Sequence, residues 1–335
     1  MRSLTLAALS LAASVVIAAP YESRFPKDNV KRASGIAAGS VATFWGQSTE
    51  NLSDVCANDN FDIVIMAFIT SLNPPKLNLG KDTGSASSAQ SAKSGWGLFD
   101  GTKAGSSGKS LADQISGCQK AGKKVMISFG GDERYSNAKF SSSDEAKTAA
   151  DYLWNLFLGG KESQDLRPFG SSVVLDGVDL DNETGDGSHY LDLVTELRSK
   201  MSSDSSKSYY ISADPVCSEY TSSDASIPDE VLPKLDFVNV QFYNNQQQGI
   251  GGSAFQTTLQ GWEKKLTSAS PSPKLFLGIP GGTGAASTNV QSATEIKSTI
   301  QSVKSSTDFG GVMIWDAGYA MANTGFPSAV KSALA

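Results

Sequence analysis

Eight short apolar segments recur along the chain, and most of the stretches between them are long enough to hold a helix. The segments are rich in Val, Ile, Leu and Phe, and they cover residues 41–47, 61–69, 124–131, 173–183, 208–216, 237–245, 274–282 and 311–319. Their apolar residues run almost continuously, which is typical of strands that are covered on both faces. Helix-like stretches lie between them at 110–121, 142–158, 188–201, 253–266 and 291–304.

This alternation predicts an α/β fold, a single-domain (β/α)8 TIM barrel, because strand–helix–strand order leads naturally to right-handed crossovers. An open doubly wound sheet is the alternative. It would need a motif at its switch point, and the first segment ends in WGQS rather than in a glycine-rich phosphate turn. The longest interruption, residues 71–109, follows the second strand. In a barrel it leaves on the catalytic face, as one wall of a cleft or as a surface loop.

The N-terminal residues predict export and processing. Residues 1–19 hold a basic residue, an apolar run and closing small residues, the layout of a signal peptide. The run is shorter than the roughly 20 apolar residues that a membrane-spanning helix needs. Residues 20–32 end in the dibasic pair Lys31-Arg32, which predicts a propeptide before a barrel domain at 33–335. We therefore expect a secreted, extracellular protein without a membrane partner.

Charge and composition exclude other partners. The chain has 28 Lys and Arg against 34 Asp and Glu, a formal net charge of −6. It therefore lacks the basic face that nucleic-acid binding requires. One His and three Cys are too few for a dedicated zinc or iron–sulfur site, so no metal and no cofactor is expected. We expect the protein to act as a monomer.

The fourth predicted strand ends in DGVDLDNE, at residues 176–183. Alternate residues of an extended chain share a face, so Asp179, Asp181 and Glu183 project to one side, each about 6.6–6.8 Å from the next. In a barrel strand that side is the interior, and the row climbs toward the mouth. Asp176 lies on the opposite parity, and spacing alone gives it no role.

Three acids in a barrel interior without compensating bases must share protons, so at least one pKa should rise. A protonated carboxylic acid beside an ionised carboxylate is the arrangement that protonates the leaving oxygen in glycoside cleavage. The alternatives are a solvated acidic edge and a calcium loop, and the Val and Leu spacers disfavour the calcium loop.

With these residues the chain resembles glycoside hydrolase family 18, most closely the plant-type (class III) chitinases that also occur in fungi. DGVDLDNE matches the family signature D-G-x-D-x-D-x-E at every fixed position, and the resemblance extends over essentially the whole chain after residue 32. Supporting matches, in the order of the family, are FWGQ at 44–47, SFGG at 128–131, RPFG at 167–170, QFYNN at 241–245 and MIWD at 313–316.

The resemblance implies a retaining, endo-acting chitinase whose substrate is chitin or an N-acetylglucosamine oligosaccharide. Glu183 would protonate the glycosidic oxygen, and the acetamide carbonyl of the sugar would attack the anomeric carbon to give an oxazolinium ion. Asp181 would hydrogen-bond the acetamide N–H, and Asp179 would share a proton beneath it. The substrate-binding residues would be Tyr243 on the acetamide oxygen, Trp315 as the floor under the sugar, and Gln241, Asn244, Phe44 and Gln47 in the lining.

Two positions depart from the pattern of the family. Phe44 stands where plant-type relatives usually carry Tyr, and Asp214 adds an acid near the mouth of the fifth strand, where it could shift the pH optimum. The resemblance also implies a disulfide between Cys56 and Cys118. It leaves Cys217 as a free thiol, because glutamines replace its usual partner after QFYNN.

Other functions remain open from the sequence alone. A non-catalytic chitin-binding or inhibitor barrel would share the fold, but the three acids and Tyr243 are all present. An endo-β-N-acetylglucosaminidase acting on glycoproteins shares the chemistry and differs in cleft shape. A phosphate cradle at 278–288 would follow the seventh strand, but no Lys or Arg lies close to it.

Overall fold

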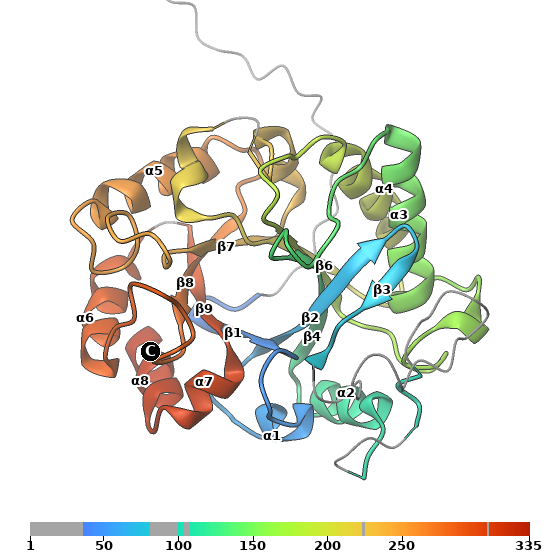
Figure 1. Ribbon diagram of the computed structural model, residues 1–335, viewed down its shortest axis with the longest axis horizontal. Coiled ribbons are helices and arrows are strands. Elements are labelled where there is room, and N and C mark those ends of the chain that lie inside the picture. The colour runs from blue at the N-terminus through green and yellow to red at the C-terminus, as the bar shows by residue number, and fades with distance from the viewer. Residues whose placement is uncertain (1–35, 81–99, 104–107, 223–224, 307) are drawn as a thin grey trace, which may run out of the picture. The chain divides into compact units, whose positions relative to one another are not determined.

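The computed structural model describes residues 36–80, 100–103, 108–222, 225–306 and 308–335. Residues 1–32, with the predicted signal peptide and propeptide, lie outside the described residues. Eight parallel strands form a closed ring in the order β1-β9-β8-β7-β6-β5-β4-β2, and β2 pairs again with β1 (Figure 1). The predicted (β/α)8 barrel is confirmed, and the open doubly wound sheet is excluded.

Each barrel strand overlaps one of the eight predicted apolar segments. A ninth strand, β3 (Pro75–Leu77), pairs antiparallel with the far end of β2 and lies outside the ring. The barrel strands are β1 (Ser40–Trp45), β2 (Ile63–Leu72), β4 (Lys124–Gly131), β5 (Gly177–Asn182), β6 (Tyr210–Ala213), β7 (Phe237–Gln241), β8 (Lys274–Pro280) and β9 (Phe309–Trp315).

Helices surround the ring (Figure 1), and the five predicted helix-like stretches all form one. These five are α2 (Leu111–Lys120), α3 (Ser143–Phe157), α4 (Tyr190–Ser203), α5 (Phe255–Thr267) and α6 (Ala293–Val303). Shorter elements are α1 (Leu52–Cys56), α7 (Ala317–Ala322), α8 (Phe326–Leu334), and the 3-10 helices η2 (Gln164–Leu166), η3 (Cys217–Thr221) and η4 (Asp229–Lys234). Serine N-caps begin α2, α3 and α6, where the hydroxyl accepts an otherwise unpaired backbone N–H.

The core has two layers, because alternate residues of each strand point to opposite sides of the sheet. In β2, Val64 and Met66 pack outward against the helices, whereas Ile63, Ile65 and Ala67 belong to a cluster inside the barrel. A fully buried side chain of the size of Val, Ile or Met contributes about 1.5–3 kcal/mol. Burial on both sides explains why the strands are almost continuously apolar in sequence.

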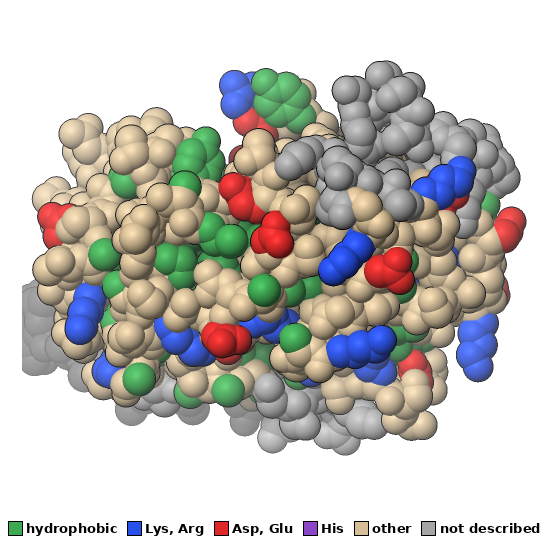
Figure 2. Space-filling model, turned by 90° about the horizontal axis from the view of Figure 1, so that it is seen from below, with side chains coloured by type: hydrophobic (Ala, Val, Ile, Leu, Met, Phe, Trp, Pro, Cys, Tyr) green, Lys and Arg blue, Asp and Glu red, His purple; other side chains and the backbone are tan. Residues whose placement is uncertain are grey.

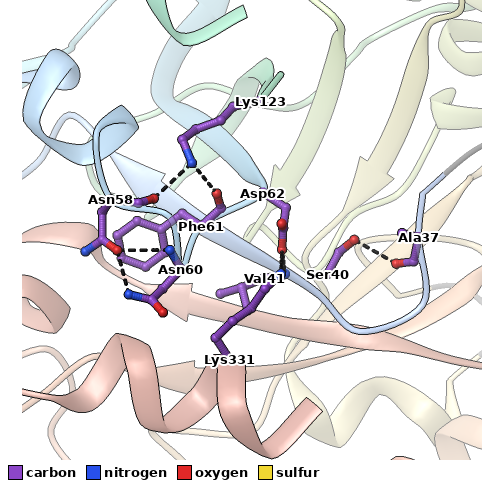
Figure 3. Close-up of polar contacts among 9 residues, drawn as sticks. All are labelled: Ala37, Ser40, Val41, Asn58, Asn60, Phe61, Asp62, Lys123 and Lys331. Atoms are coloured by element: carbon purple, nitrogen blue, oxygen red, sulfur yellow. Dashed lines mark hydrogen bonds and ion pairs between the residues drawn. The ribbon is translucent and has the colours of Figure 1, made fainter. Parts of the chain in front are cut away.

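Asp62 directly precedes β2, and Figure 3 shows its contacts with Val41 of β1 and with Lys331. Its carboxylate accepts the backbone N–H of Val41 at 2.7 Å, and it also pairs with Lys331 of α8. Nearby, Lys123 donates to two backbone carbonyl oxygens, those of Asn58 at 2.9 Å and Phe61 at 2.7 Å. Side chains thus satisfy backbone groups that the end of the sheet leaves open.

Asp176 and Asp236 repeat this arrangement on two other strands. Asp176 precedes β5 and accepts the N–H of Val125 in β4 at 2.8 Å. Asp236 precedes β7 and accepts the N–H of Ile211 in β6 at 2.7 Å. Asp176, to which spacing gave no role, is therefore a structural residue at the end of the barrel opposite the row of acids.

On the face shown in Figure 2, Lys and Arg side chains lie interspersed with Asp and Glu among neutral surface. Neither sign of charge gathers there into a continuous patch. Within the described part of the chain, no helix combines the length and the apolar character that crossing a membrane would require.

Candidate functional site

A cavity of about 320 Å³ opens at the carboxyl ends of the barrel strands. Its lining comes from the ends of β1, β2, β4, β5, β7 and β9 and from the residue that follows β6. In barrels of this class that face carries the active site. All six predicted substrate-binding residues line the cavity, namely Phe44, Gln47, Gln241, Tyr243, Asn244 and Trp315, and so do Asp181 and Glu183.

Asp179 lies beneath the cavity, completely buried in the barrel. The strand register places it between Ser128 of β4 and Ser212 of β6. Ser128 donates its hydroxyl to one carboxylate oxygen at 2.7 Å, and Ser212 donates to the other. Asp179 is therefore held from both sides.

Asp181 and Glu183 continue the row from Asp179 toward the cavity. Asp181 is 4% exposed at the end of β5, and Glu183 follows that strand by one residue. The side-chain nitrogen of Gln241 bridges the two acids, 3.2 Å from Asp181 Oδ1 and 3.4 Å from Glu183 Oε1. The structure thus brings together the three acids and the glutamine that the sequence predicts for one site.

Burial changes the protonation of these acids. It raises the pKa of Glu183, an effect that the hydrogen bond from Gln241 opposes. Burial also raises the pKa of Asp181 well above its usual range, and the negative charges of Glu183 and Asp179 add to the rise. A carboxyl group that retains its proton in a cavity can act as a general acid near neutral pH.

The close approach of β4 to Asp181 depends on the first glycine of SFGG. Gly130 has a φ of +122°, and a Cβ atom at this position would lie 2.0 Å from the backbone oxygen of Asp181. Any side chain would therefore push β4 away from the row of acids. The motif has a steric role in the site.

Asp214 is a fourth buried carboxyl group at the cavity. It follows β6, is 1% exposed, and lies against Asp179 and Asn239. Neither carboxylate oxygen forms a well-aligned hydrogen bond with any residue that the structure describes, and the same holds for the side-chain amide of Asn239. Burial, with the charge of Asp179, raises the pKa of Asp214 well above its usual range. The sequence indicated Asp214 but not Asn239, which lies two residues before Gln241 in β7 and therefore on the same face of that strand.

Three aromatic rings form the floor of the cavity. Trp315 packs edge-on against Phe44, with ring centroids 5.3 Å apart, and it stacks on Phe68 at 5.9 Å. Phe44 is only 1% exposed, so it mainly supports Trp315 from below. Sequence reasoning missed Phe68, because nothing in the apolar run of β2 distinguishes a ring that faces the mouth.

Tyr243 is buried beside the acids. Its burial and the nearby charges of Asp181, Asp214, Glu183 and Asp179 raise the pKa of the phenol well above its usual range. The hydroxyl group therefore keeps its proton and can donate a hydrogen bond to a ligand in the cavity.

Gln47 and Asn244 lie at the rim. The side chain of Gln47 donates to the backbone oxygens of Ala67 at 2.7 Å and Asn78 at 3.1 Å. Asn78 belongs to the long interruption after the second predicted strand, so part of that interruption lines the cavity. Asn244 accepts from the backbone N–H of Ser287 at 2.8 Å, which holds its side-chain oxygen toward the segment after β8.

Cys56 of α1 and Cys118 of α2 form a disulfide, with their Cα atoms 5.2 Å apart, and Cys217 is a free, buried thiol. Within the described residues, no group of three or more His, Cys, Asp or Glu side chains is arranged to hold a metal ion.

Comparison with known proteins places these features in a family. Residues 40–297 match the family described as glycosyl hydrolases family 18. Endochitinase 3 of Metarhizium robertsii is 35% identical over 302 residues, which cover 88% of this chain and 90% of that protein.

Two solved structures share the barrel. The crystal structure of ICChI chitinase from Ipomoea carnea superposes with a TM-score of 0.71 at 29% identity, covering 88% of this chain and all of that one. The xylanase and α-amylase inhibitor protein XAIP-II from Scadoxus multiflorus superposes equally well, at 26% identity, covering 88% of this chain and 99% of that one. The same barrel thus occurs in a chitinase and in a protein described as an inhibitor.

Proposed function

Because the chain belongs to glycoside hydrolase family 18, we propose that it is an endo-acting chitinase that hydrolyses β-1,4-linked N-acetylglucosamine with retention of configuration. The observation that carries this proposal is the pair Asp181 and Glu183, bridged by Gln241 at the end of β5 and open to a cavity floored by Trp315. A barrel that only inhibits other enzymes needs no general acid, whereas here Glu183 lines the cavity beside Asp181.

In the first step Glu183 donates its proton to the glycosidic oxygen. The bond from that oxygen to the anomeric carbon breaks, and the acetamide carbonyl oxygen of the same sugar attacks the anomeric carbon. The product is an oxazolinium ion, and the substrate itself supplies the nucleophile that a second carboxylate provides in other retaining enzymes. The raised pKa of Glu183 supports this step, since the group must begin protonated.

Two neighbours of Glu183 orient the acetamide. Asp181 accepts the acetamide N–H and stabilises the positive charge of the oxazolinium ion, while Tyr243 donates to the acetamide oxygen. Asp179, fixed by Ser128 and Ser212, shares a proton with Asp181 from below. In the second step, ionised Glu183 removes a proton from water, and the water opens the oxazolinium ion on the face that the leaving group occupied.

The N-terminal residues carry a second part of the proposal. Residues 1–19 direct the chain to the secretory pathway, and residues 20–32 are removed after Lys31-Arg32. Export fits the disulfide between Cys56 and Cys118, since such bonds persist in oxidising compartments. N-terminal sequencing of the protein recovered from the culture medium should begin at Ala33. A start inside residues 20–32 would contradict the propeptide.

The decisive experiment compares wild type with Glu183→Gln on chitin oligosaccharides. We expect the variant to lose at least about 10²-fold in kcat, because general acid catalysis contributes typically 10²–10⁴-fold. Equal thermal unfolding of the two proteins controls for folding. NMR of the wild-type products should show the retained β-anomer first.

Each alternative function has its own outcome in the same assay. A wild type that binds the oligosaccharides without cleaving them would establish the non-catalytic barrel. Release of N-linked glycans from a glycoprotein, with no action on chitin oligosaccharides, would establish the endo-β-N-acetylglucosaminidase. An inverted product, or equal turnover by Glu183→Gln, would overturn the mechanism.

A further inference from the structure

Tyr135 has a solvent-exposed aromatic ring at the edge of the cavity. It lies in the turn after β4, lines the cavity, and is 74% exposed. It is the most exposed large hydrophobic side chain among the described residues. An aromatic ring left in water beside a binding cavity is a surface that a ligand can cover.

The ring is held by its neighbours. The guanidinium of Arg134 lies over it, 5.4 Å from the ring centroid. Arg134 is itself fixed to the carboxylate of Asp132, with Nε 2.9 and 3.0 Å from the two oxygens. A cation placed over one face of an aromatic ring leaves the other face available.

The backbone of the turn is also fixed. The N–H of Tyr135 donates to Asp132 O at 2.9 Å, and the hydroxyl of Ser136 donates to Gly131 O at 2.9 Å. The N–H of Asn137 donates to Thr70 O of β2 at 2.7 Å. The ring is therefore presented by a turn tied to two barrel strands, which lowers the entropy lost when a ligand orders it.

We propose that Tyr135 is a second sugar platform of the cleft, stacking on a ring of the polysaccharide other than the one held over Trp315. This inference rests on the proposed function. The two rings lie on different sides of the mouth, since β1 and β2 separate β9 from β4 in the ring of strands. A pyranose has an apolar face that fits an aromatic ring, so a polymer spanning the cavity would cover Tyr135.

The test compares substrate lengths. We expect Tyr135→Ala to lower kcat/KM on a chitin hexasaccharide about three- to tenfold, the factor expected for one aromatic stacking contact. A short substrate, a chitobiose linked to a fluorogenic leaving group, should change less than about twofold by the same reasoning. Tyr135→Phe keeps the ring and should behave as wild type. Tyr319→Ala, at an exposed tyrosine outside the cavity lining, serves as the control.

Binding measurements separate this inference from the catalytic proposal. Titration calorimetry with the hexasaccharide compares Glu183→Gln with the double variant Glu183→Gln/Tyr135→Ala. A Kd weaker by about three- to tenfold in the double variant supports the platform even if the wild type proves not to hydrolyse chitin. Equal Kd values, or an equal loss of kcat/KM on the long and the short substrates, would overturn it.

Discussion

The side-chain nitrogen of Gln241 lies 3.2 Å from Asp181 Oδ1, within hydrogen-bonding reach of an acid on a different strand. The same nitrogen lies 3.4 Å from Glu183, and the backbone oxygen of Asp214 accepts from it at 2.8 Å. One amide group therefore connects three of the four carboxyl-bearing residues of the site. It is a donor to Asp181 and Glu183, the two acids that contact the substrate in the proposed mechanism.

Replacement of Gln241 by Leu should move the alkaline limb of the pH–rate profile. The hydrogen bond from Gln241 lowers the pKa of Glu183, so its removal should raise that pKa and keep the general acid protonated to higher pH. We expect kcat to fall as well, because the acids lose a positioning donor. The measurement is kcat/KM against pH.

Gln119→Leu is the matched control for Gln241→Leu. Gln119 donates to Asp176 at 2.8 Å, at the opposite end of the barrel. Its replacement should leave the pH profile unchanged. A profile for Gln241→Leu that overlays the wild type, or shifts to lower pH, would contradict the assigned role.

Replacement of Trp315 by Ala should weaken substrate binding. The ring stacks on Phe68 and contacts Phe44, so it is held ready to receive a sugar face. We expect kcat/KM on chitin oligosaccharides to fall by about tenfold or more, with a smaller loss for Trp315→Phe. Trp154→Phe is the control, because Trp154 packs on Tyr209 and does not line the cavity. Equal losses for the two Phe variants would argue against a sugar floor.

Replacement of Asp214 by Asn should stabilise the protein at neutral pH. The pKa of Asp214 is raised in the folded state, so the folded state binds its proton more tightly than the unfolded state does. Stability from this group is therefore greatest below its unfolded pKa of about 3.9, and it is lost as the pH rises above that value. Asn cannot ionise and so removes this loss of stability, and we expect Asp214→Asn to be more stable than the wild type at pH 7.

Urea unfolding at pH 7 and at pH 3.5 checks the Asp214 prediction. The gain of Asp214→Asn should be present at pH 7 and absent at pH 3.5. Glu230→Gln, at an exposed carboxylate, should change neither value. A variant that is less stable than wild type at pH 7 would mean that Asp214 is ionised and usefully paired.

The cysteines should respond differently to thiol reagents. Cys217 is buried, and burial raises the pKa of its thiol to about 11, so the native protein should not react at pH 8. Unfolding without reductant should expose one thiol per chain. A count of three thiols would rule out the bridge between Cys56 and Cys118.

The bridge between Cys56 and Cys118 spans 62 residues of the chain. Replacing both cysteines by Ser should therefore lower the free energy of unfolding, measured in urea, by about 2–4 kcal/mol.

The fold could be predicted because its strands are buried on both faces. The ends of the strands are predicted less accurately than their number and order. The predicted strand at 173–183 is a strand only over Gly177–Asn182. Val173 and Leu175 are buried as deeply as strand residues, but their N–H groups bond to residues of a turn and a helix end. A run of apolar residues predicts that a segment is buried. It does not predict which backbone groups the segment forms hydrogen bonds with.

The site, too, could be predicted only in part. The period of two along β5 predicted Asp179, Asp181 and Glu183 on one face, because it depends on one strand alone. The two serines that hold Asp179 follow from the register between neighbouring strands, which no single segment encodes. Tyr135 escaped notice for a related reason, since its position depends on how a turn leaves the barrel.

The pairing of β1 with β9 has a consequence for biosynthesis. The first strand can pair with its final neighbour only after β9 has been translated. Until then the nascent polypeptide exposes unpaired strand edges, on which other chains can aggregate. A product truncated before residue 309 should therefore be a target for chaperones and proteases rather than a smaller working hydrolase.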